Sequence, residues 1–261
     1  MTTTPHADRL AHLDGAIAEA CRAAGRRRDE VTLLAVSKEQ PDEAVDAFYA
    51  LGLRDFGENK VQALDRRSGS RWPEARWHLI GPLQTNKAKD VARLRPTLVH
   101  SIDRADLVTA LAKRLPAPLA PAGDTASAGP ARLACLVQVD IDREPQKAGV
   151  LPEDLEPLLD LIGATPSLSC RGLMAIPRPL DAADPTSERA LRKSFDAMRA
   201  LADTHAQRFA DPDAVVLSMG MSDDFAIAIA HGATLVRIGT ALFGPRSSWR
   251  PVPPVPFATE D

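Results

Sequence analysis

One lysine in the segment "LLAVSKEQPDEAV", which begins at Leu33, stands between two structural patterns. The mostly apolar residues from Leu33 to Ser37 predict a short buried strand, and Pro41 followed by acidic residues predicts a helix start. Lys38 lies between them. Lysines often occur at strand ends only because the chain surfaces there. A neutral amine can also attack a carbonyl carbon, and burial favours the neutral form. Lys38 is therefore either a surface residue or a candidate Schiff-base lysine.

The elements that must position Lys38 alternate along the chain. Strict alternation of strands and helices predicts parallel strands, and about eight such units fit a single α/β domain over 1–261. We therefore predict a (β/α)8 TIM-type barrel with an extra N-terminal helix, and a doubly wound open sheet is the main alternative. The predicted strands are 31–37, 54–57, 76–81, 97–102, 132–141, 168–176, 214–219 and 234–239. The predicted helices are 10–24, 41–51, 59–67, 105–115 and 191–201, with others starting near 85, 152 and 222.

Composition excludes several classes of function. The net charge of −3, from 32 basic and 35 acidic side chains, gives no support for nucleic-acid binding. The three cysteines form no CxxC pair and no metal-ligand pattern. The chain shows no signal peptide and no apolar run long enough to span a membrane, so we expect a cytoplasmic protein. Segment 116–131 predicts a loop, and 246–261 predicts a Pro-rich tail.

Small and hydroxyl-bearing residues follow the seventh and eighth predicted strands. In barrels of this class the functional groups lie at the carboxyl ends of the strands, and the last two loops often bind phosphate. Here these loops contain Ser218, Gly220, Ser222, Gly239 and Thr240. Ser222 is also the predicted N-cap of a helix, whose positive end favours a dianion. The loops therefore predict a phosphate site, although each alone would also fit an ordinary Gly/Ser turn.

An arginine lies inside the apolar eighth strand, "TLVRIG". Arg237 needs a partner if it is buried. The partner would be an acidic residue of the barrel, or the pyridine nitrogen of pyridoxal 5′-phosphate (PLP), which the guanidinium would keep unprotonated. A lysine and a phosphate site at one barrel mouth are compatible with a sugar phosphate or with PLP.

Eight motifs together resemble the pyridoxal phosphate homeostasis protein family, whose barrel is similar to the N-terminal domain of alanine racemase. They are "AVSK", "FGENKVQ", "WHLIGPLQTNK", "VHSID", "KAGV", "GLMAIP", "LSMGMSDDF" and "VRIGTALFG". The resemblance implies that Lys38 forms the PLP aldimine and that Arg237 faces the pyridine nitrogen. It implies Ser218, Gly239 and Thr240 at the phosphate. The implied lining of the cofactor pocket is Asn59, His78, Met174 and Met219.

The sequence departs from the family pattern at a few positions. Glu39 and Gln40 stand where a Thr or a basic residue is more usual, and Ala226 stands where a Glu is common. None of these positions is an expected cofactor contact. Glu39 adds a carboxylate next to Lys38 in the sequence, where it would affect exchange of the cofactor.

The resemblance implies a carrier that holds or buffers PLP, supports vitamin B6 and amino-acid homeostasis, and has no established catalytic activity. We expect a monomer, because the sequence shows no extra dimerisation domain. Transient contact with PLP-dependent apo-enzymes would follow. The alternative is an amino-acid racemase, which needs a second base, normally a tyrosine from a second domain. The single tyrosine, Tyr49, lies in the helix after strand one. His78 or His100 would be the substitutes. A Schiff-base aldolase is a third alternative, but it leaves Arg237 unexplained.

Overall fold

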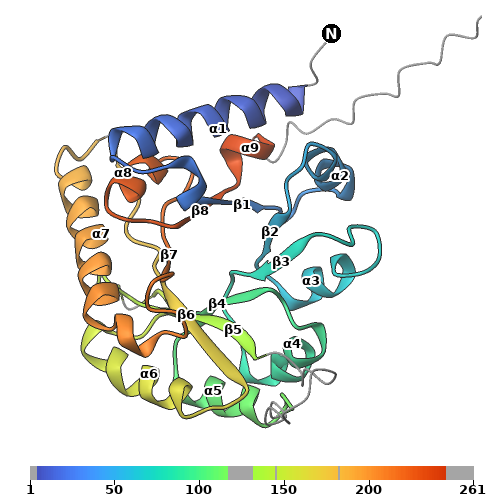
Figure 1. Cartoon of the computed structure of the whole chain (residues 1–261), viewed down its shortest axis with the longest axis vertical. Coiled ribbons are helices and arrows are strands. Elements are labelled where there is room, and N and C mark those ends of the chain that lie inside the picture. Colours follow the sequence, from blue (N-terminus) through green and yellow to red (C-terminus); the bar gives the residue numbers. More distant parts are fainter. Residues whose placement is uncertain (1–4, 117–131, 145, 182, 245–261) are drawn as a thin grey trace, which may run out of the picture.

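Eight parallel strands close into a barrel in the computed structural model, which describes residues 5–116, 132–144, 146–181 and 183–244. The strands follow one another in chain order, and β8 pairs with β1, so the predicted barrel is confirmed and no open sheet is formed (Figure 1). All eight predicted strands occur, with ends that differ by a few residues. The strands are β1 (Thr32–Val36), β2 (Asp55–Glu58), β3 (Arg76–Leu79), β4 (Leu98–Ile102), β5 (Leu133–Gln138), β6 (Leu168–Met174), β7 (Val216–Ser218) and β8 (Leu235–Ile238).

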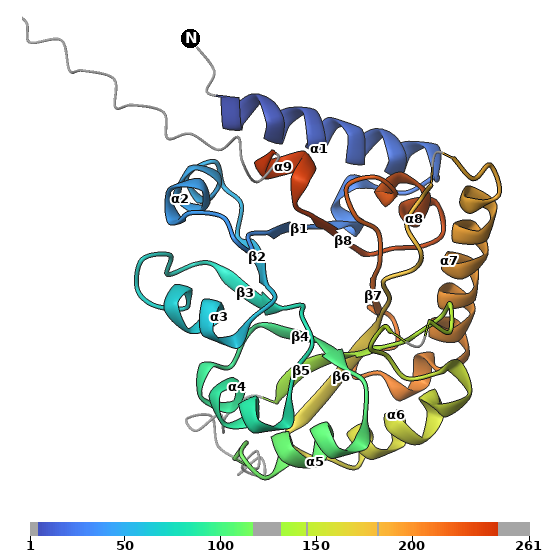
Figure 2. The ribbon, with the colours of Figure 1, turned by 180° about the vertical axis from the view of Figure 1, so that it is seen from behind.

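Helices surround the barrel on its outside, as both views of the ribbon show (Figure 1 and Figure 2). The α-helices are α1 (Pro5–Ala23), α2 (Asp42–Ala50), α3 (Val61–Arg67), α4 (Ala88–Leu94), α5 (Ala105–Ala112), α6 (Leu155–Gly163), α7 (Ser187–Thr204), α8 (Phe225–Ala230) and α9 (Thr240–Phe243). Short 3-10 helices lie at Arg28–Glu30, Thr85–Lys87, Pro152–Asp154 and Ala206–Arg208.

The extra N-terminal helix is confirmed, and its apolar spacing explains where it packs. Leu13, Ile17 and Cys21 recur at four-residue intervals and are buried. They form one stripe of α1, which lies against α8, α9 and α2 and covers the place where the last barrel units meet the first.

The apolar core divides into an outer layer and an interior. The largest cluster fills the space between strands and helices and includes Phe48, Phe56 and Phe195. Smaller clusters remain separate from it, one around Leu34 and another around Leu136. These two belong to residues that point into the barrel, so the barrel interior is packed rather than open.

The predicted N-cap of helix α8 is wrong. Helix α8 begins at Phe225, with Asp224 in the N-cap position. The carboxylate of Asp224 instead accepts a hydrogen bond from the backbone N–H of Met221 at 2.5 Å, which closes the turn before the helix. The Ser222 hydroxyl accepts a hydrogen bond from the backbone of Ala241 at 3.3 Å. Helix α8 ends at Ala230, and Gly232 follows with a φ of +94°, which cannot continue a helix.

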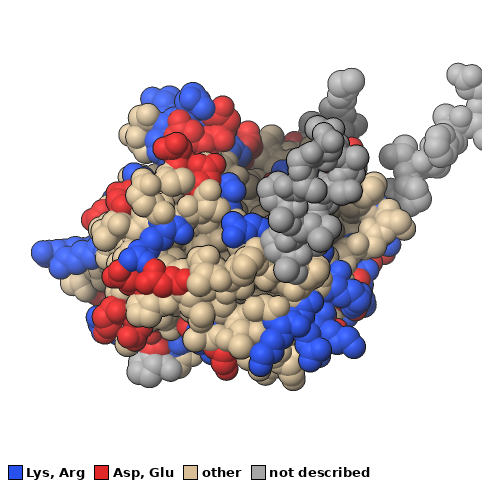
Figure 3. Space-filling view, turned by 60° about the horizontal axis from the view of Figure 1, so that its bottom comes forward, with Lys and Arg blue, Asp and Glu red and all other residues tan. Residues whose placement is uncertain are grey.

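The surface carries both signs of charge. On the face shown in Figure 3, Lys and Arg lie among Asp and Glu. Ion pairs such as Arg93–Asp65 link side chains of opposite charge on the surface. None of the described helices combines the length and apolar character that crossing a membrane requires. The predicted tail 246–261 and all but the first residue of the predicted loop 116–131 lie outside the described residues.

Candidate functional site

Lys38 lies immediately after β1, in a turn at the carboxyl end of the barrel strands. Its side chain is half-buried and makes no hydrogen bond or ion pair with any other residue in the described ranges. The next residue, Glu39, adopts a φ of +60°, which is uncommon for a residue with a side chain. The amine of Lys38 is therefore presented by a tight turn and is not engaged in a structural ion pair.

A buried ion pair holds the turn that carries Lys38. Arg67 of α3 donates to Glu58 Oε1 at 2.5 Å and to the backbone oxygen of Ser37 at 2.9 Å. It also donates to the backbone oxygen of Gln40, so it contacts the chain on both sides of Lys38. The hydroxyl of Ser37 donates to Glu58 Oε1 at 2.7 Å.

The sequence analysis did not predict this ion pair between Arg67 and Glu58. Its only signal was Glu58 at the end of an apolar strand, since a buried carboxylate needs a partner. Arg67 was not predictable as that partner, because it lies at the end of a helix whose rotation against the barrel the sequence does not fix.

Arg237 lies on β8, opposite Leu34 of β1, and its side chain is almost completely buried at 5% exposure. Burial lowers its pKa to about 10. It donates to the backbone oxygen of Ser218 at 2.7 Å, to Ser218 Oγ at 2.8 Å and to the backbone oxygen of Ala175 at 2.8 Å. Within the part of the chain that the structure describes, no carboxylate lies within ion-pair distance, so the predicted alternative of an acidic partner is not formed. A guanidinium has five N–H groups, and two of them have no described partner.

The loops after β7 and β8 lie beside each other because β7 and β8 are paired. The Ser222 hydroxyl bonds the backbone of Ala241 and joins the two loops. The backbone N–H groups of Ser222, Gly239 and Thr240 have no hydrogen-bond partner among the described residues. Gly239 is half-buried and Thr240 is exposed at the start of α9.

Gly220 shows why the loop after β7 needs a small residue. Its φ is +93°, and a Cβ at this position would lie 2.6 Å from Cβ of Ala228. Its carbonyl oxygen accepts the backbone N–H of Arg237 at 2.9 Å. Glycine therefore lets the loop pack closely on α8 while it stays paired to β8.

The other predicted site residues occupy different surroundings. Ser218 is fully buried, and its hydroxyl contacts Arg237 and His100 inside the barrel. Met174 belongs to the interior cluster with Leu98, whereas Met219 belongs to the outer core.

Asn59 and His78 complete the predicted set. Asn59 is half-buried just after β2, and its carbonyl oxygen packs so closely on Gly81 that a Cβ there would lie 2.2 Å away. His78 on β3 is buried, with contacts to His100 and Asp55. The structure therefore brings Lys38 together with the loops of β7 and β8, and it places His78 deeper in the barrel.

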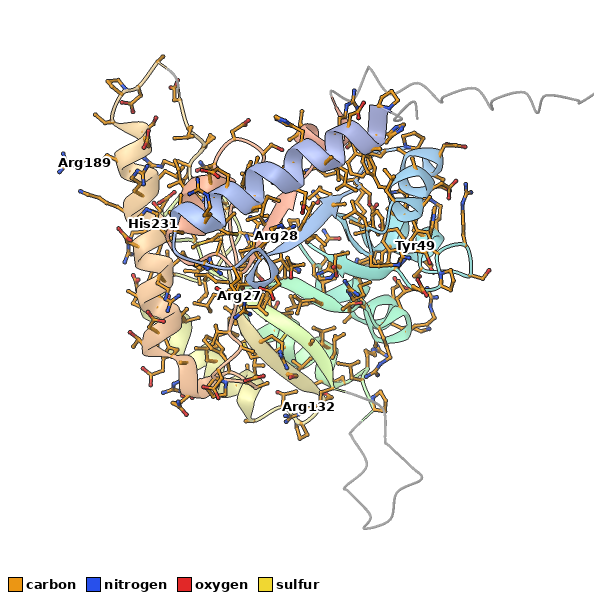
Figure 4. All side chains as sticks on the ribbon, turned by 45° about the horizontal axis from the view of Figure 1, so that its top comes forward. Arg27, Arg28, Tyr49, Arg132, Arg189 and His231 are labelled. Carbon is orange, nitrogen blue, oxygen red and sulfur yellow. The ribbon has the colours of Figure 1, made fainter. Side chains whose placement is uncertain are left out.

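Two cavities lie at opposite ends of the strands. A cavity of about 1480 Å³ opens at the amino ends, where Arg27, Asp55, His78 and Arg132 line it, and Figure 4 shows Arg27 and Arg132. A cavity of about 140 Å³ lies at the carboxyl ends, between the segments after β3, β5 and β6. No group of three His, Cys, Asp or Glu in the described ranges could hold a metal ion.

The single tyrosine lies outside the barrel, on α2 (Figure 4). The Tyr49 hydroxyl accepts a hydrogen bond from the backbone of Glu74 at 3.3 Å. The guanidinium of Arg54 lies over its ring, 4.3 Å from the centroid. Tyr49 is thus engaged in the helical layer.

The closed barrel, with a lysine after its first strand and an arginine on its last, belongs to the class described as "Alanine racemase, N-terminal domain", which matches residues 13–247. The chain is a member of the pyridoxal phosphate homeostasis protein family, as its motifs predicted. It is 42% identical to the Pseudomonas aeruginosa protein of that name, over 94% of this chain and 97% of the relative. It is 38% identical to the Escherichia coli K12 protein, over 92% and 96%.

Solved structures agree with this assignment. PipY of Synechococcus elongatus with PLP bound is 32% identical, with a TM-score of 0.68 over 87% of this chain and 100% of that one. Alanine racemase from Corynebacterium glutamicum has a TM-score of 0.61 at 16% identity, over 95% of this chain and 63% of that one, which is a likeness of fold alone.

Proposed function

We propose that the protein binds PLP covalently at Lys38 and holds or buffers it in support of vitamin B6 and amino-acid homeostasis, without catalysing a reaction of its own. One observation carries the proposal. Three consecutive barrel units, β8, β1 and β7, carry a buried arginine with no carboxylate at ion-pair distance, a lysine amine and three backbone N–H groups, and neither the amine nor these N–H groups have a partner among the described residues. A PLP-bound relative with the same fold supports it.

Lys38 would supply the covalent anchor. The amine of Lys38, in its neutral form, would hold the cofactor by attack on its aldehyde carbon, with loss of water. The clamp of Arg67 and Glu58 keeps the turn in place without using the amine itself. When bound, the cofactor contributes an electrophilic aldehyde and an aromatic ring that can accept electrons.

Arg237 would hold the ring nitrogen. Arginine only donates hydrogen bonds, and two N–H groups of Arg237 have no partner among the described residues. Its charge disfavours a proton on a neighbouring pyridine nitrogen. An unprotonated ring is a weaker electron sink, which suits storage of the cofactor better than reaction of a bound amino acid.

The loops after β7 and β8 would hold the phosphate. Backbone N–H groups of Ser222, Gly239 and Thr240 are unpartnered in the described chain, and such groups bind phosphate oxygens. The hydroxyl of Ser218 contacts Arg237 and His100 inside the barrel. We therefore propose that Ser218 positions Arg237, and that the backbone N–H groups of the other loop residues are the donors nearest to the phosphate.

The three candidate second bases of the racemase alternative are engaged elsewhere in the described structure. Tyr49 is held in the helical layer by Glu74 and Arg54, and His78 and His100 are both hydrogen-bonded within the barrel. These contacts support a non-catalytic role. An aldolase would leave Arg237 without a ligand atom to accept its hydrogen bonds.

The test is to add PLP to the purified protein, reduce it with borohydride and map the modified peptide. We expect a visible absorption band and a single labelled peptide that contains Lys38. Lys38→Ala should remove the label, whereas the matched control Lys60→Ala, exposed after β2, should retain it. A label that persists in Lys38→Ala would refute the anchor. Turnover of amino-acid enantiomers by the loaded protein would favour the racemase.

Two further parts of the proposal concern partners. We propose a monomer, which light scattering after size exclusion would test. We also propose transient contact with PLP-dependent apo-enzymes. Activation of an apo-enzyme faster than free PLP release allows would support direct transfer, and equal rates would oppose it.

A further inference from the structure

A chain of polar side chains crosses the barrel interior. Interiors of such barrels are normally filled with branched apolar side chains, and here the clusters around Leu34 and Leu98 follow that rule. The barrel interior also contains charged or polar side chains that are at most 13% exposed. They are Arg237, Ser218, His100, His78 and Asp55.

Each member of this interior chain contacts the next. Arg237 Nη1 lies 2.8 Å from Ser218 Oγ. Ser218 Oγ lies 3.0 Å from His100 Nδ1, and His100 Nε2 lies 3.0 Å from His78 Nδ1. His78 Nε2 lies 3.3 Å from Asp55 Oδ1. The residues come from β8, β7, β4, β3 and β2, so the chain spans most of the barrel cross-section.

The donors and acceptors of these five side chains fix the direction of the hydrogen bonds that link them. Arginine can only donate, so Ser218 Oγ accepts from Arg237. Within the described ranges the only acceptor for the proton of Ser218 Oγ is His100 Nδ1. His100 must then carry its proton on Nε2 and donate to His78 Nδ1, and His78 donates from Nε2 to the carboxylate of Asp55. Both imidazoles are thereby neutral and in the same tautomer.

The electrostatics agree with this assignment. Complete burial of the ring is the largest cause that holds the pKa of His100 well below its usual value, and the charge of Arg237 adds to it, which agrees with a neutral imidazole. Burial opposes ionisation of Asp55, but hydrogen bonds from Arg76 and His78 outweigh it and lower its pKa. Arg76 completes the far end with contacts of 2.7 and 2.5 Å to Asp55, beside the large cavity at the amino ends of the strands.

We propose that His100 and His78 are positioning residues, which fix the guanidinium of Arg237 through Ser218 so that its unused N–H groups face the ring nitrogen of the cofactor. This inference rests on the proposed function of Arg237. It assigns a role to His78 that differs from direct contact with the cofactor, and it adds His100 and Asp55 to the residues on which the site depends.

The first measurement reads the tautomers without any cofactor. Long-range ¹H–¹⁵N spectra of the [¹⁵N]histidine-labelled apo-protein should show that the imidazoles of His100 and His78 are neutral and protonated on Nε2. Variants His100→Asn and His78→Gln assign the two signals. A proton on Nδ1 of His100, or a charged His78 at neutral pH, would overturn the deduced direction.

The second measurement compares PLP affinity and absorption spectrum among variants of His100. His100→Leu removes both contacts and should weaken PLP binding about tenfold and shift the band, the size expected for one buried hydrogen bond. His100→Asn keeps an acceptor for Ser218 and should restore the spectrum. His12→Leu, which is exposed on α1, should change nothing.

The outcomes separate the two proposals. A wild-type protein that binds no PLP overturns the proposed function and the positioning role with it. A wild type that binds PLP, together with a His100→Leu variant of unchanged affinity and spectrum, overturns the positioning role alone. If His100→Leu does not fold, the wild-type tautomers and the spectrum of His100→Asn decide the question.

Discussion

Removal of Arg67 tests whether the turn that carries Lys38 depends on a buried ion pair. In Arg67→Met the apolar stem is largely kept, while the charge and all the donors disappear. Glu58, which is 1% exposed, then loses its cationic partner. The backbone oxygens of Ser37 and Gln40 lose their donor on both sides of Lys38.

The expected cost follows from the burial. Removing one member of a buried ion pair costs about 3–5 kcal/mol, because the remaining charge is left uncompensated. The lost bonds to backbone oxygens overlap with this figure, so we expect about 4 kcal/mol of lost stability in total. Arg67→Met combined with Glu58→Gln removes the stranded charge and should recover about half of it.

The assay is urea unfolding followed by circular dichroism, with linear extrapolation to water. Arg66→Met is the matched control, since Arg66 is the exposed neighbour on the same helix, and it should change stability by less than about 0.5 kcal/mol. PLP binding by the folded variant should also slow, because the Lys38 turn is less well held. An Arg67→Met protein as stable as Arg66→Met would refute the reasoning, and so would a double variant less stable than Arg67→Met.

Three further predictions address the rest of the site. The pKa of His100 lies below its unfolded value near 6.5, so the unfolded chain binds more protons below that pH. Stability should be complete above pH 6.5 and fall as the pH drops towards the folded pKa, by up to about 1.4 kcal/mol per pH unit, and His100→Asn should flatten this slope in urea titrations. Gly220→Ala meets a φ of +93° and Cβ of Ala228 at 2.6 Å, and should cost about 1–3 kcal/mol; Gly69→Ala, with open space around it, is the control for thermal melts. Arg237→Glu should permit protonation of the ring nitrogen and change the absorption spectrum of the PLP-bound protein, and an unchanged spectrum would assign Arg237 a structural role only.

Much of the fold followed from local pattern. Apolar runs of four to eight residues, each followed by a helical period, predict parallel strands wherever they occur, because hydrophobic periodicity is a local property. The strand ends differed by a few residues, since pairing with neighbours and not composition decides where a ladder stops. The predicted N-cap at Ser222 failed for a related reason. Several hydroxyls and carboxylates compete near a helix start, and packing selected Asp224.

The candidate site was predictable where position along a strand fixes direction. Lys38, Arg237, Gly239 and Thr240 follow or end strands that a closed barrel must bring to one face, and order along the chain made β8 the neighbour of β1. The position of a residue at the carboxyl end of a strand can be predicted from the sequence, because a closed barrel brings all these ends to one face.

The sequence alone therefore predicted the barrel, the family and the end of the barrel at which the candidate site residues lie. Which buried polar groups contact one another became clear only when the barrel was seen in three dimensions. Ser218 and His100 are 118 positions apart, and Arg67 and Ser37 are 30 apart. A buried polar side chain needs a hydrogen-bond partner, and this need can be predicted from the sequence. The identity of the partner depends on side-chain directions across five strands, which exist only once the barrel has closed.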